Sequence, residues 1–315
     1  MDYFQSKNLK PMSIDNLSRP FDSDKYIYEL KLNGIRCLAY LDETSTTLID
    51  KHNVLLNDYF PELITIHAHV KCKCILDGVI IVLKRGVSDK AGIEKRTPRV
   101  GIPKGPILEK EFPASFIAFD MIYLNNKPLV TVPLMERKKL LEETVNDTLR
   151  LAASRYVLQH GISMFYLAKR NNLDGIIAKH INSLYYPATT TKEWINVLIS
   201  AYHYYVVCGY YILDQDKVHI ILGQYRDQEL VFKGKIETNL DQDFLLKYPV
   251  KAAASSPFRL TPMSKLQIVW LFPTQVCEIL ITDEDTTKNS MKSFIQFIHE
   301  KSPKECIEGT KNDAK

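Results

Sequence analysis

A chain of 315 residues, of which 45% are hydrophobic and 25% charged, is long enough for two domains and has an ordinary globular composition. No stretch approaches the roughly 18 consecutive apolar residues of a membrane-spanning helix, and the N-terminal MDYFQSKNLKPMS lacks the apolar core of a signal peptide. We therefore expect a cytoplasmic protein with no membrane association. The net charge of +4 is uneven: residues 1–200 hold 27 basic and 22 acidic side chains, whereas residues 201–315 hold 14 and 15. Charge gives modest support for phosphate binding by the first part.

The first two-thirds of the chain predicts a mixture of strands and helices. Residues 25–42 are typical of a β-hairpin, because strand-like alternation continues on both sides of an Asn33-Gly34 turn. Further strands are predicted at 74–83, 115–124, 174–180 and 193–199, and helices at 134–147 and 161–172. The stretch 84–110 is rich in Gly and Pro and predicts a loop. Its eight basic and three acidic residues fit either a solvated loop or one that faces nucleic acid.

After residue 200 the pattern changes to β-rich runs separated by short turns, which is typical of a small barrel. We therefore expect a domain boundary there, with one domain at residues 1–200 and a second at 201–315. The six cysteines show no pairing or histidine cluster at the spacing of a zinc site.

Five short segments carry the functional argument, and their order matters more than any one of them. They are ELKLNGIR (29–36), ILDGV (75–79), FIAFDMIY (116–123), DGIIAK (174–179) and EWINVL (193–198). This order resembles the covalent nucleotidyltransferase superfamily, and specifically the ATP-dependent DNA ligases of the compact bacterial type. The resemblance extends to KPMSIDN, FPEL, YYPATTTKEW and the tail FIQFIHEKSPKEC, and so covers nearly the whole chain.

The resemblance implies an α+β architecture. The first domain would be an adenylation (nucleotidyltransferase) domain, ATP-grasp-like, with antiparallel sheets and flanking helices. The second would be a small β-barrel of the OB-fold type. It also implies ATP with Mg²⁺ or Mn²⁺, nicked duplex DNA as substrate, roles in DNA repair and recombination with repair or end-joining partners, and a monomeric protein.

The implied chemistry begins at Lys31, which occupies the position of the nucleophilic lysine. In the family this amine attacks the α-phosphate of ATP and expels pyrophosphate, leaving a lysyl-AMP phosphoramidate. AMP then passes to the 5′-phosphate of a nick, and the 3′-hydroxyl displaces it. Because an amine attacks only when it is neutral, nearby cations such as Arg36 and Lys179 would help to lower its pKa.

The resemblance assigns further roles by position. Lys179 would touch the α-phosphate, Arg36 the ribose or a DNA phosphate, and Glu29 the adenine amino group. Phe119 would stack on the base, although a strand core residue is the alternative. The remaining assignments are Gly34, Asp174 and Trp194 for the nucleotide, Asp174 and Asp77 for the metal, and Lys95, Arg96, Arg99 and Lys301 for nucleic acid.

Several positions depart from the family's motifs: Asp174 replaces a glutamate, Ala188-Thr189-Thr190 replaces G-K-R, and charge is also lost at Asn33, Val79, Asn196, Leu198 and Ile298. Asn33 and Val79 replace carboxylates of K-x-D-G and D-G-E. Asn196 and Leu198 replace the lysines of W-x-K-x-K, and Ile298 replaces the arginine of R-x-D-K. Charged hydrogen bonds of this kind are each worth about 1.5–3 kcal/mol, or one to two decades in rate.

Three hypotheses follow. The first is an ATP-dependent DNA ligase, slow or with relaxed requirements, which the retained Lys31, Gly34, Arg36 and Lys179 favour. The second is a non-catalytic homologue that binds nucleic acid or nucleotide, which the lost charges favour. The third is an RNA ligase or a capping-type guanylyltransferase, against which the tail segment SPKEC argues, because it is similar to DNA ligases.

Overall fold

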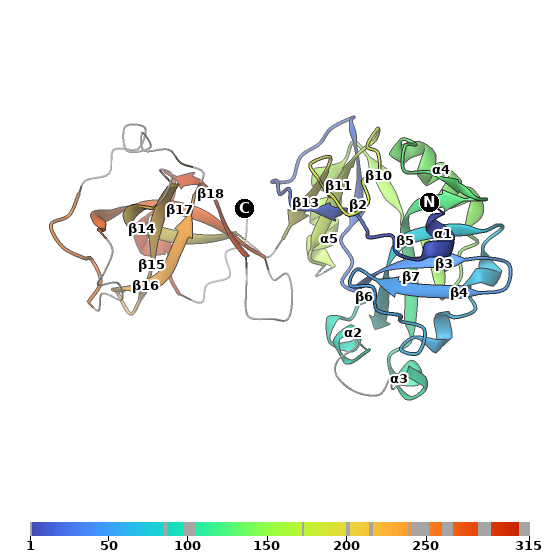
Figure 1. Ribbon diagram of the computed structural model, residues 1–315. Helices are drawn as coiled ribbons and strands as arrows, with labels where there is room; N and C mark the ends of the chain where they lie inside the picture. The colour runs from blue at the N-terminus through green and yellow to red at the C-terminus, as the bar shows by residue number, and fades with distance from the viewer. Residues whose placement is uncertain are drawn as a thin grey trace. The chain divides into compact units, whose positions relative to one another are not determined.

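The computed structural model divides into two compact units, Met1–Ile199 and Ser200–Lys315 (Figure 1). It describes residues 2–84, 87–96, 105–171, 173–199, 202–213, 217–238, 240, 252–259, 267–282 and 291–308. No helix in these ranges is long and apolar enough to cross a membrane.

The first unit is built on two mostly antiparallel sheets. The seven-stranded sheet contains β3 (Ile35–Leu41), β4 (Thr46–Asp50), β5 (Cys74–Lys84), β6 (Val87–Ser88), β7 (Ala114–Leu124), β8 (Lys127–Pro128) and β9 (Leu151–Ala153). The four-stranded sheet has the order β10 (Tyr156–Leu158), β2 (Tyr26–Leu30), β11 (Gly175–His180) and β13 (Trp194–Leu198). A two-stranded parallel pair joins β1 (Ser13–Ile14) to β12 (Thr190–Thr191).

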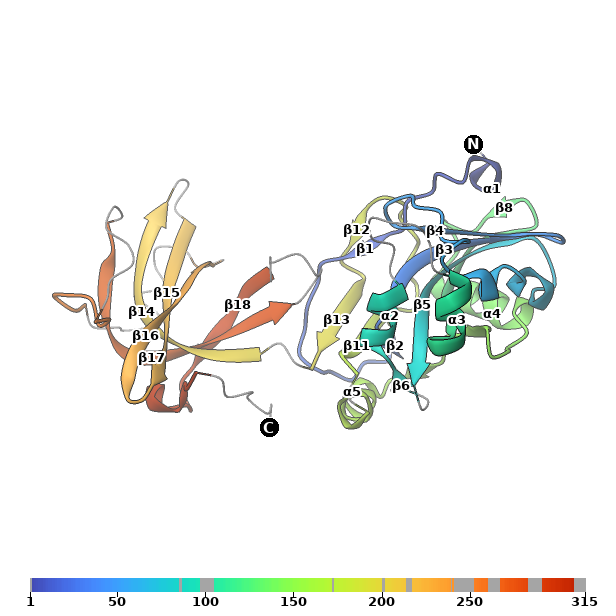
Figure 2. The same cartoon turned by 90° about the horizontal axis from the view of Figure 1, so that it is seen from below.

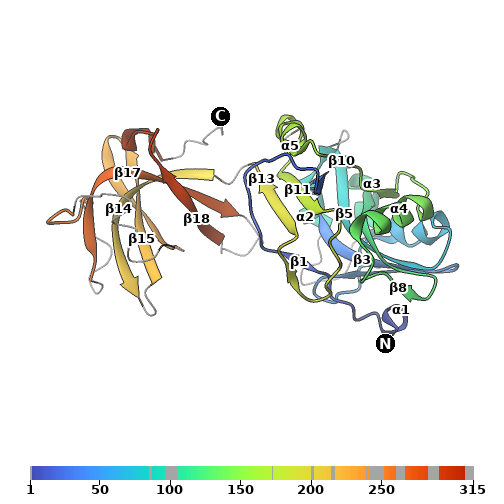
Figure 3. The ribbon, with the colours of Figure 1, turned by 90° about the horizontal axis from the view of Figure 1, so that it is seen from above.

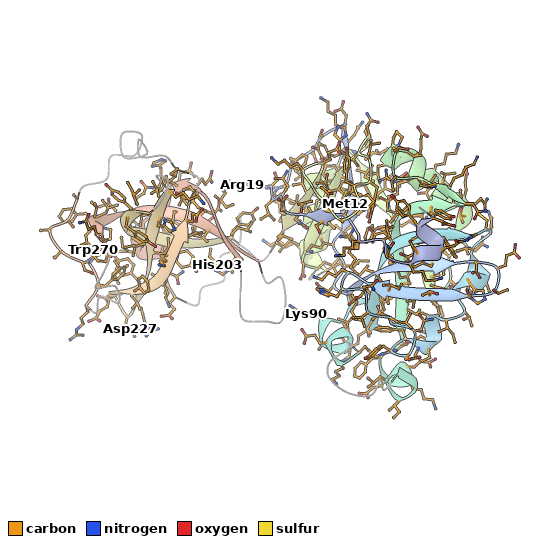
Figure 4. All side chains as sticks on the ribbon, viewed as in Figure 1. Met12, Arg19, Lys90, His203, Asp227 and Trp270 are labelled. Atoms are coloured by element: carbon orange, nitrogen blue, oxygen red, sulfur yellow. The ribbon has the colours of Figure 1, made fainter. Side chains whose placement is uncertain are left out.

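Apolar side chains from both sheets meet in one core, so the sheets face each other. Ile27 and Trp194 of the four-stranded sheet share a buried cluster with Leu38 and Ile75 of the seven-stranded one. Met12, which is labelled in Figure 4, is completely buried in the same cluster.

Helices pack around the two sheets. They are α1 (Tyr3–Ser6), α2 (Lys90–Arg96), α3 (Gly105–Glu111), α4 (Leu134–Thr144) and α5 (Gly161–Arg170), with 3₁₀ turns at Pro61–Leu63 and Ile66–His69. Helix α5 lies against β2, β10 and β11 (Figure 3), where Phe165 and Ala168 pack on the four-stranded sheet. Helix α2 packs against β5 (Figure 2), and α4 packs against β7. The predicted helices and the strands other than the hairpin are thus confirmed, with ends shifted by a few residues.

The predicted hairpin at residues 25–42 is wrong, because β2 and β3 belong to different sheets. Neither Asn33 nor Gly34 has the positive φ that a two-residue hairpin turn requires. The chain instead crosses from one sheet to the other just after Lys31. Gly34 allows this crossing, since a Cβ there would lie 2.2 Å from the carbonyl oxygen of Ile80. The hydroxyl of Ser88 fixes the same segment by donating to the Asn33 carbonyl over 2.8 Å.

The predicted loop at residues 84–110 is also corrected, since its described residues include β6, α2 and part of α3. Arg96, at the end of α2, is only 2% exposed. Its guanidinium forms two hydrogen bonds with the Glu62 carboxylate and donates to the carbonyls of Tyr59 and Phe112. The expectation that Arg96 contacts nucleic acid is therefore wrong: its charge holds α2 to the rest of the unit.

The second unit is a five-stranded antiparallel sheet. Its order is β16 (Glu229–Glu237), β15 (Lys217–Arg226), β14 (Tyr202–Leu213), β17 (Val269–Thr282) and β18 (Met291–Ile298). The edge strands β16 and β18 also contact each other, so the sheet curls into the expected OB-fold-like barrel. Asp227 marks the tight turn between β15 and β16, and Trp270 lies on β17 (Figure 4). A 3₁₀ turn at Pro303–Glu305 follows, and Glu308 binds Arg226 and Lys233.

The Arg96–Glu62 pair generates a stability prediction. Arg96→Met should lower the free energy of unfolding by about 3–5 kcal/mol, because it leaves the Glu62 carboxylate buried without its counterion. Lys95→Met is the matched control: Lys95 is exposed on the same helix, and its loss should change stability by under about 0.5 kcal/mol. Urea denaturation measures both values. Equal stabilities for the two variants would contradict the structural role assigned to Arg96.

Candidate nucleotide site

One face of the four-stranded sheet carries Glu29, Lys31 and Lys179. Side chains alternate along a strand, so Glu29 and Lys31 share a face, and the pairing of Ile27 with Lys179 adds the second lysine to it. The Lys31 amide donates to the Gly175 carbonyl over 2.9 Å, which extends the β2–β11 pairing past the end of β2. Gly175 has φ +151°, and a Cβ there would lie 2.1 Å from the Val197 carbonyl oxygen. The sheet register thus directs all three charged side chains toward the second sheet.

A buried charge cluster lies at the centre of this face. The Glu29 carboxylate, 2% exposed, forms ion pairs with two lysines. Lys138 of α4 binds Oε1, and Lys179 of β11 binds Oε2 over 3.0 Å. The Ser154 hydroxyl also donates to Oε2 over 3.3 Å. Both lysines are 1% exposed, so two positive charges share one carboxylate away from solvent.

Aromatic rings complete the surroundings of Lys179. Its ammonium nitrogen lies 4.1 Å from the centre of the Trp194 ring and 4.3 Å from that of Phe119. Both distances are within the range of a cation–π contact. Burial lowers the pKa of Lys179 to about 8, and the charge of Lys138 acts in the same direction, while Glu29 opposes both. Lys179 therefore titrates close to neutral pH.

A second charge group lies beside the first. Arg36 of β3 forms two hydrogen bonds with the Asp77 carboxylate, of 2.7 and 3.2 Å, and its guanidinium lies 5.4 Å from the centre of the Phe119 ring. The Tyr185 hydroxyl donates to Asp77 over 2.7 Å. Burial, reinforced by Asp77, holds the pKa of Tyr185 well above its usual value, so this hydroxyl stays a donor.

The structure therefore brings together most of the residues predicted for catalysis and nucleotide binding. Lys179 contacts Glu29, Phe119 and Trp194, and Arg36 reaches the same phenyl ring. Lys31 lies on the same sheet face, half-buried. Among the described residues its ammonium has no hydrogen-bond or ion-pair partner. The deep part of the site is closed and the rim, which includes Lys31 and Arg36, is partly exposed.

The two residues expected to bind a metal differ in burial. Asp77 is fully buried, and its oxygens accept hydrogen bonds from Arg36 and Tyr185; its role as a metal ligand stays a prediction. Asp174 is half-buried just before β11. Within the described ranges, no group of three or more His, Cys, Asp or Glu side chains is arranged to hold a metal ion. The cations and aromatic rings of the site fit an anionic nucleotide.

The substituted positions lie on the same surfaces as the retained ones. Val79 is 8% exposed and pairs with Arg36 across β3 and β5, in a place where a carboxylate would face the guanidinium. Asn196 and Leu198 lie on β13 opposite Ile177 and Gly175, on the face that carries Lys179, and both are buried. These substitutions therefore change the charge at single positions, while the strand pairing around them is regular.

The other residues predicted to contact nucleic acid differ in their exposure. Lys95 is exposed on α2, with its ammonium 4.4 Å from the centre of the Phe112 ring. Lys301, in the second unit, is half-buried and lies 4.6 Å from the ring centre of Tyr204. Arg99 lies outside the described residues. Ile298 ends β18 and is half-buried.

Sequence reasoning missed Lys138 and the buried pair that orients its helix. Arg137 forms two 2.8 Å hydrogen bonds with the Asp120 carboxylate and donates to the carbonyl of Ser183. A signal existed for Lys138: it lies four residues after Leu134 and three before Leu141, on the buried stripe of the helix. A charged residue at such a position indicates a buried partner.

The comparison with known families decides the identity of this framework. Residues 6–197 match the family described as "ATP dependent DNA ligase domain". The chain belongs to the ATP-dependent DNA ligase family. It is similar to the SPbeta prophage-derived DNA ligase-like protein LigB of Bacillus subtilis, with 28% identity over 64% of this chain and 72% of that protein. It is also similar to DNA ligase C1 of Mycolicibacterium smegmatis, with 26% identity over 82% of this chain and 79% of that protein.

Solved structures of ligases share the fold. The ligase domain of Mycobacterium tuberculosis LigD superimposes with a TM-score of 0.56 at 21% identity, over 95% of this chain and 97% of that one. A mycobacterial DNA ligase D complexed with ATP and MES gives 0.53 with the same identity and coverage. At this identity the likeness establishes the fold alone. Membership in the ligase family implies the use of ATP and a DNA substrate.

The buried lysine of this ligase-family site gives a pH prediction. The pKa of Lys179 is about 8 in the folded chain and about 10.4 in an unfolded one. Between these values the unfolded chain carries a proton that the folded chain lacks, so folding becomes more favourable as the pH rises. The stability of the parent relative to Lys179→Met should be flat from pH 6 to 8 and then rise by up to about 3 kcal/mol by pH 10.5.

Urea denaturation at each pH measures this difference, and the subtraction removes the titration of groups that the two proteins share. A difference that stays constant from pH 6 to 10.5 would mean that Lys179 is charged in the folded protein across that range.

Proposed function

We propose that this protein is an ATP-dependent DNA ligase that seals nicks in duplex DNA through an AMP adduct on Lys31. The observation that carries the proposal is the contact of Lys179 and Arg36 with the Phe119 ring, beside the sheet face that carries Lys31, within a chain of the ligase family. Three cations at one edge of an apolar core suit a polyphosphate, and the rings suit a base.

The proposed first step is attack by the Lys31 amine on the α-phosphorus of ATP. A nitrogen–phosphorus bond forms, the bond to the β-phosphate oxygen breaks, and pyrophosphate leaves with that electron pair. Lys31 must lose its proton, which the cations Lys179 and Arg36 favour. Magnesium or manganese belongs with the triphosphate as part of the substrate, since Asp77 is occupied by Arg36 and Tyr185.

The second candidate function is nucleotide or nucleic-acid binding without catalysis. The buried apolar side chains of Val79 and Leu198 favour it, because they stand where the family has charged groups and offer a phosphate or ribose no polar contact. The two functions differ in one observable, the covalent adduct. A ligase forms lysyl-AMP, whereas a binding protein holds AMP reversibly.

The covalent step gives a direct prediction. Incubation with α-labelled ATP and magnesium or manganese should place acid-labile AMP on Lys31, and peptide mapping by mass spectrometry should locate it. Lys31→Ala should remove the label. Lys25→Ala, which replaces an exposed lysine just before β2, should keep it. Label on another lysine would refute the assignment of the nucleophile. Absence of label with either metal would favour the binding function.

DNA contact gives a separate prediction. Lys90 and Lys95 are exposed on α2, with Lys90 labelled in Figure 4, and we propose that they contact phosphates. Replacing both with Ala should weaken binding to nicked duplex and flatten its salt dependence by about two units, at about 0.9 per phosphate. Fluorescence anisotropy across a salt series measures the slope. Lys139→Ala, which removes an exposed lysine from α4, serves as control, and an unchanged slope in the α2 variant would remove this helix from the interface.

A further inference from the structure

The buried cluster of Glu29, Lys138 and Lys179 carries one net positive charge when both lysines are protonated. Glu29 supplies one carboxylate, and Lys138 and Lys179 supply two ammonium groups. Asp120, on β7, also faces Lys179, but both of its oxygens are bound by Arg137. A surplus positive charge is costly where water is excluded, so the cluster favours either the loss of a proton or the arrival of an anion.

The two lysines are held differently. Lys179 lies between the Phe119 and Trp194 rings, on the sheet face that also carries Lys31. Lys138 comes from α4, contacts the other carboxylate oxygen, and has its ammonium 5.5 Å from the centre of the Tyr156 ring. Each oxygen of Glu29 thus has its own cation, and one ion pair can open while the other stays closed.

We propose that Lys138 is a positioning residue, which keeps the Glu29 carboxylate neutralised so that Lys179 can leave Glu29 and bind the phosphate of a nucleotide. The proposal rests on the proposed function and adds the way in which the closed site accepts its anion. Without Lys138, Lys179 would be the counterion that Glu29 requires, and an incoming phosphate would meet an unbalanced carboxylate. With Lys138 in place, the phosphate meets a site that carries one net positive charge.

The test measures reversible binding of AMP by calorimetry, in full-length protein that carries Lys31→Ala so that no adduct forms. Lys138→Met should bind AMP about 10- to 100-fold more weakly, the effect expected for removing one unit charge a few ångströms from the anion. Lys138→Arg keeps the charge and should bind like the parent. The matched control is Lys139→Met, because Lys139 is the next residue on α4 and is 76% exposed.

A pH series distinguishes this charge effect from a loss of packing. The groups that face Lys179 are Glu29 on β2, Lys138 on α4 and Asp120 on β7, and Tyr156 on β10 lies against Lys138. In the parent, AMP binding should weaken as the pH passes about 8, where Lys179 loses its proton. In Lys138→Met the pH at which AMP binding weakens should be higher, because the ammonium of Lys138 no longer lowers the pKa of Lys179. A packing defect would weaken binding at every pH without moving the midpoint.

Circular dichroism melting confirms folding, and Lys138→Gln carries the same expectations if the Met variant does not fold. AMP binding by Lys138→Met that equals that of Lys139→Met, with the same pH midpoint, would overturn the role of Lys138 and leave the nucleotide site intact. No AMP binding by any of the proteins, the parent included, would overturn the nucleotide site and this proposal together.

Discussion

The Glu29 carboxylate, shared between the ammonium groups of Lys138 and Lys179, is the contact on which the arrangement of the site depends. It joins three elements that are far apart in sequence: β2, α4 and β11. Opposite charges buried together hold their partners in place, because separating them leaves an uncompensated charge in a medium of low dielectric constant. The same contact fixes Lys179 between two aromatic rings and ties the strand that leads into Lys31 to the helix across the core.

The residues that depart from the ligase motifs leave the strands around them intact. Val79, Asn196 and Leu198 lie on the faces that carry Arg36 and Lys179, and each is buried with little disturbance of the strands around it. Arg36 keeps a full set of partners because Asp77 and Tyr185 satisfy it. The chain has thus retained Arg36 and Lys179 and lost charge at other positions on the same sheet faces.

Local patterns in the sequence predicted the strands at β5, β7, β11 and β13 and the helices α4 and α5, because each buries an apolar face that repeats at its own period. The hairpin failed for a physical reason. Alternation shows that 25–42 contains strands, but it does not say which strands they pair with, and β2 pairs with β10 and β11 from more than a hundred residues away. The resemblance to the ligases assigned Lys179 and Phe119 to one site, and the two side chains are in contact. The burial of Arg96 and of Lys138 was not predicted, because their acidic partners, Glu62 and Glu29, are distant in sequence.

A structure of the Lys31→Ala protein with bound ATP tests the central claim of the account most directly. The account predicts that the Lys179 ammonium leaves Glu29 and lies within hydrogen-bond distance of an α-phosphate oxygen, while Lys138 stays on the other oxygen of Glu29. The base should lie against Phe119. A complex in which Lys179 remains paired with Glu29 and the phosphates bind elsewhere would contradict it.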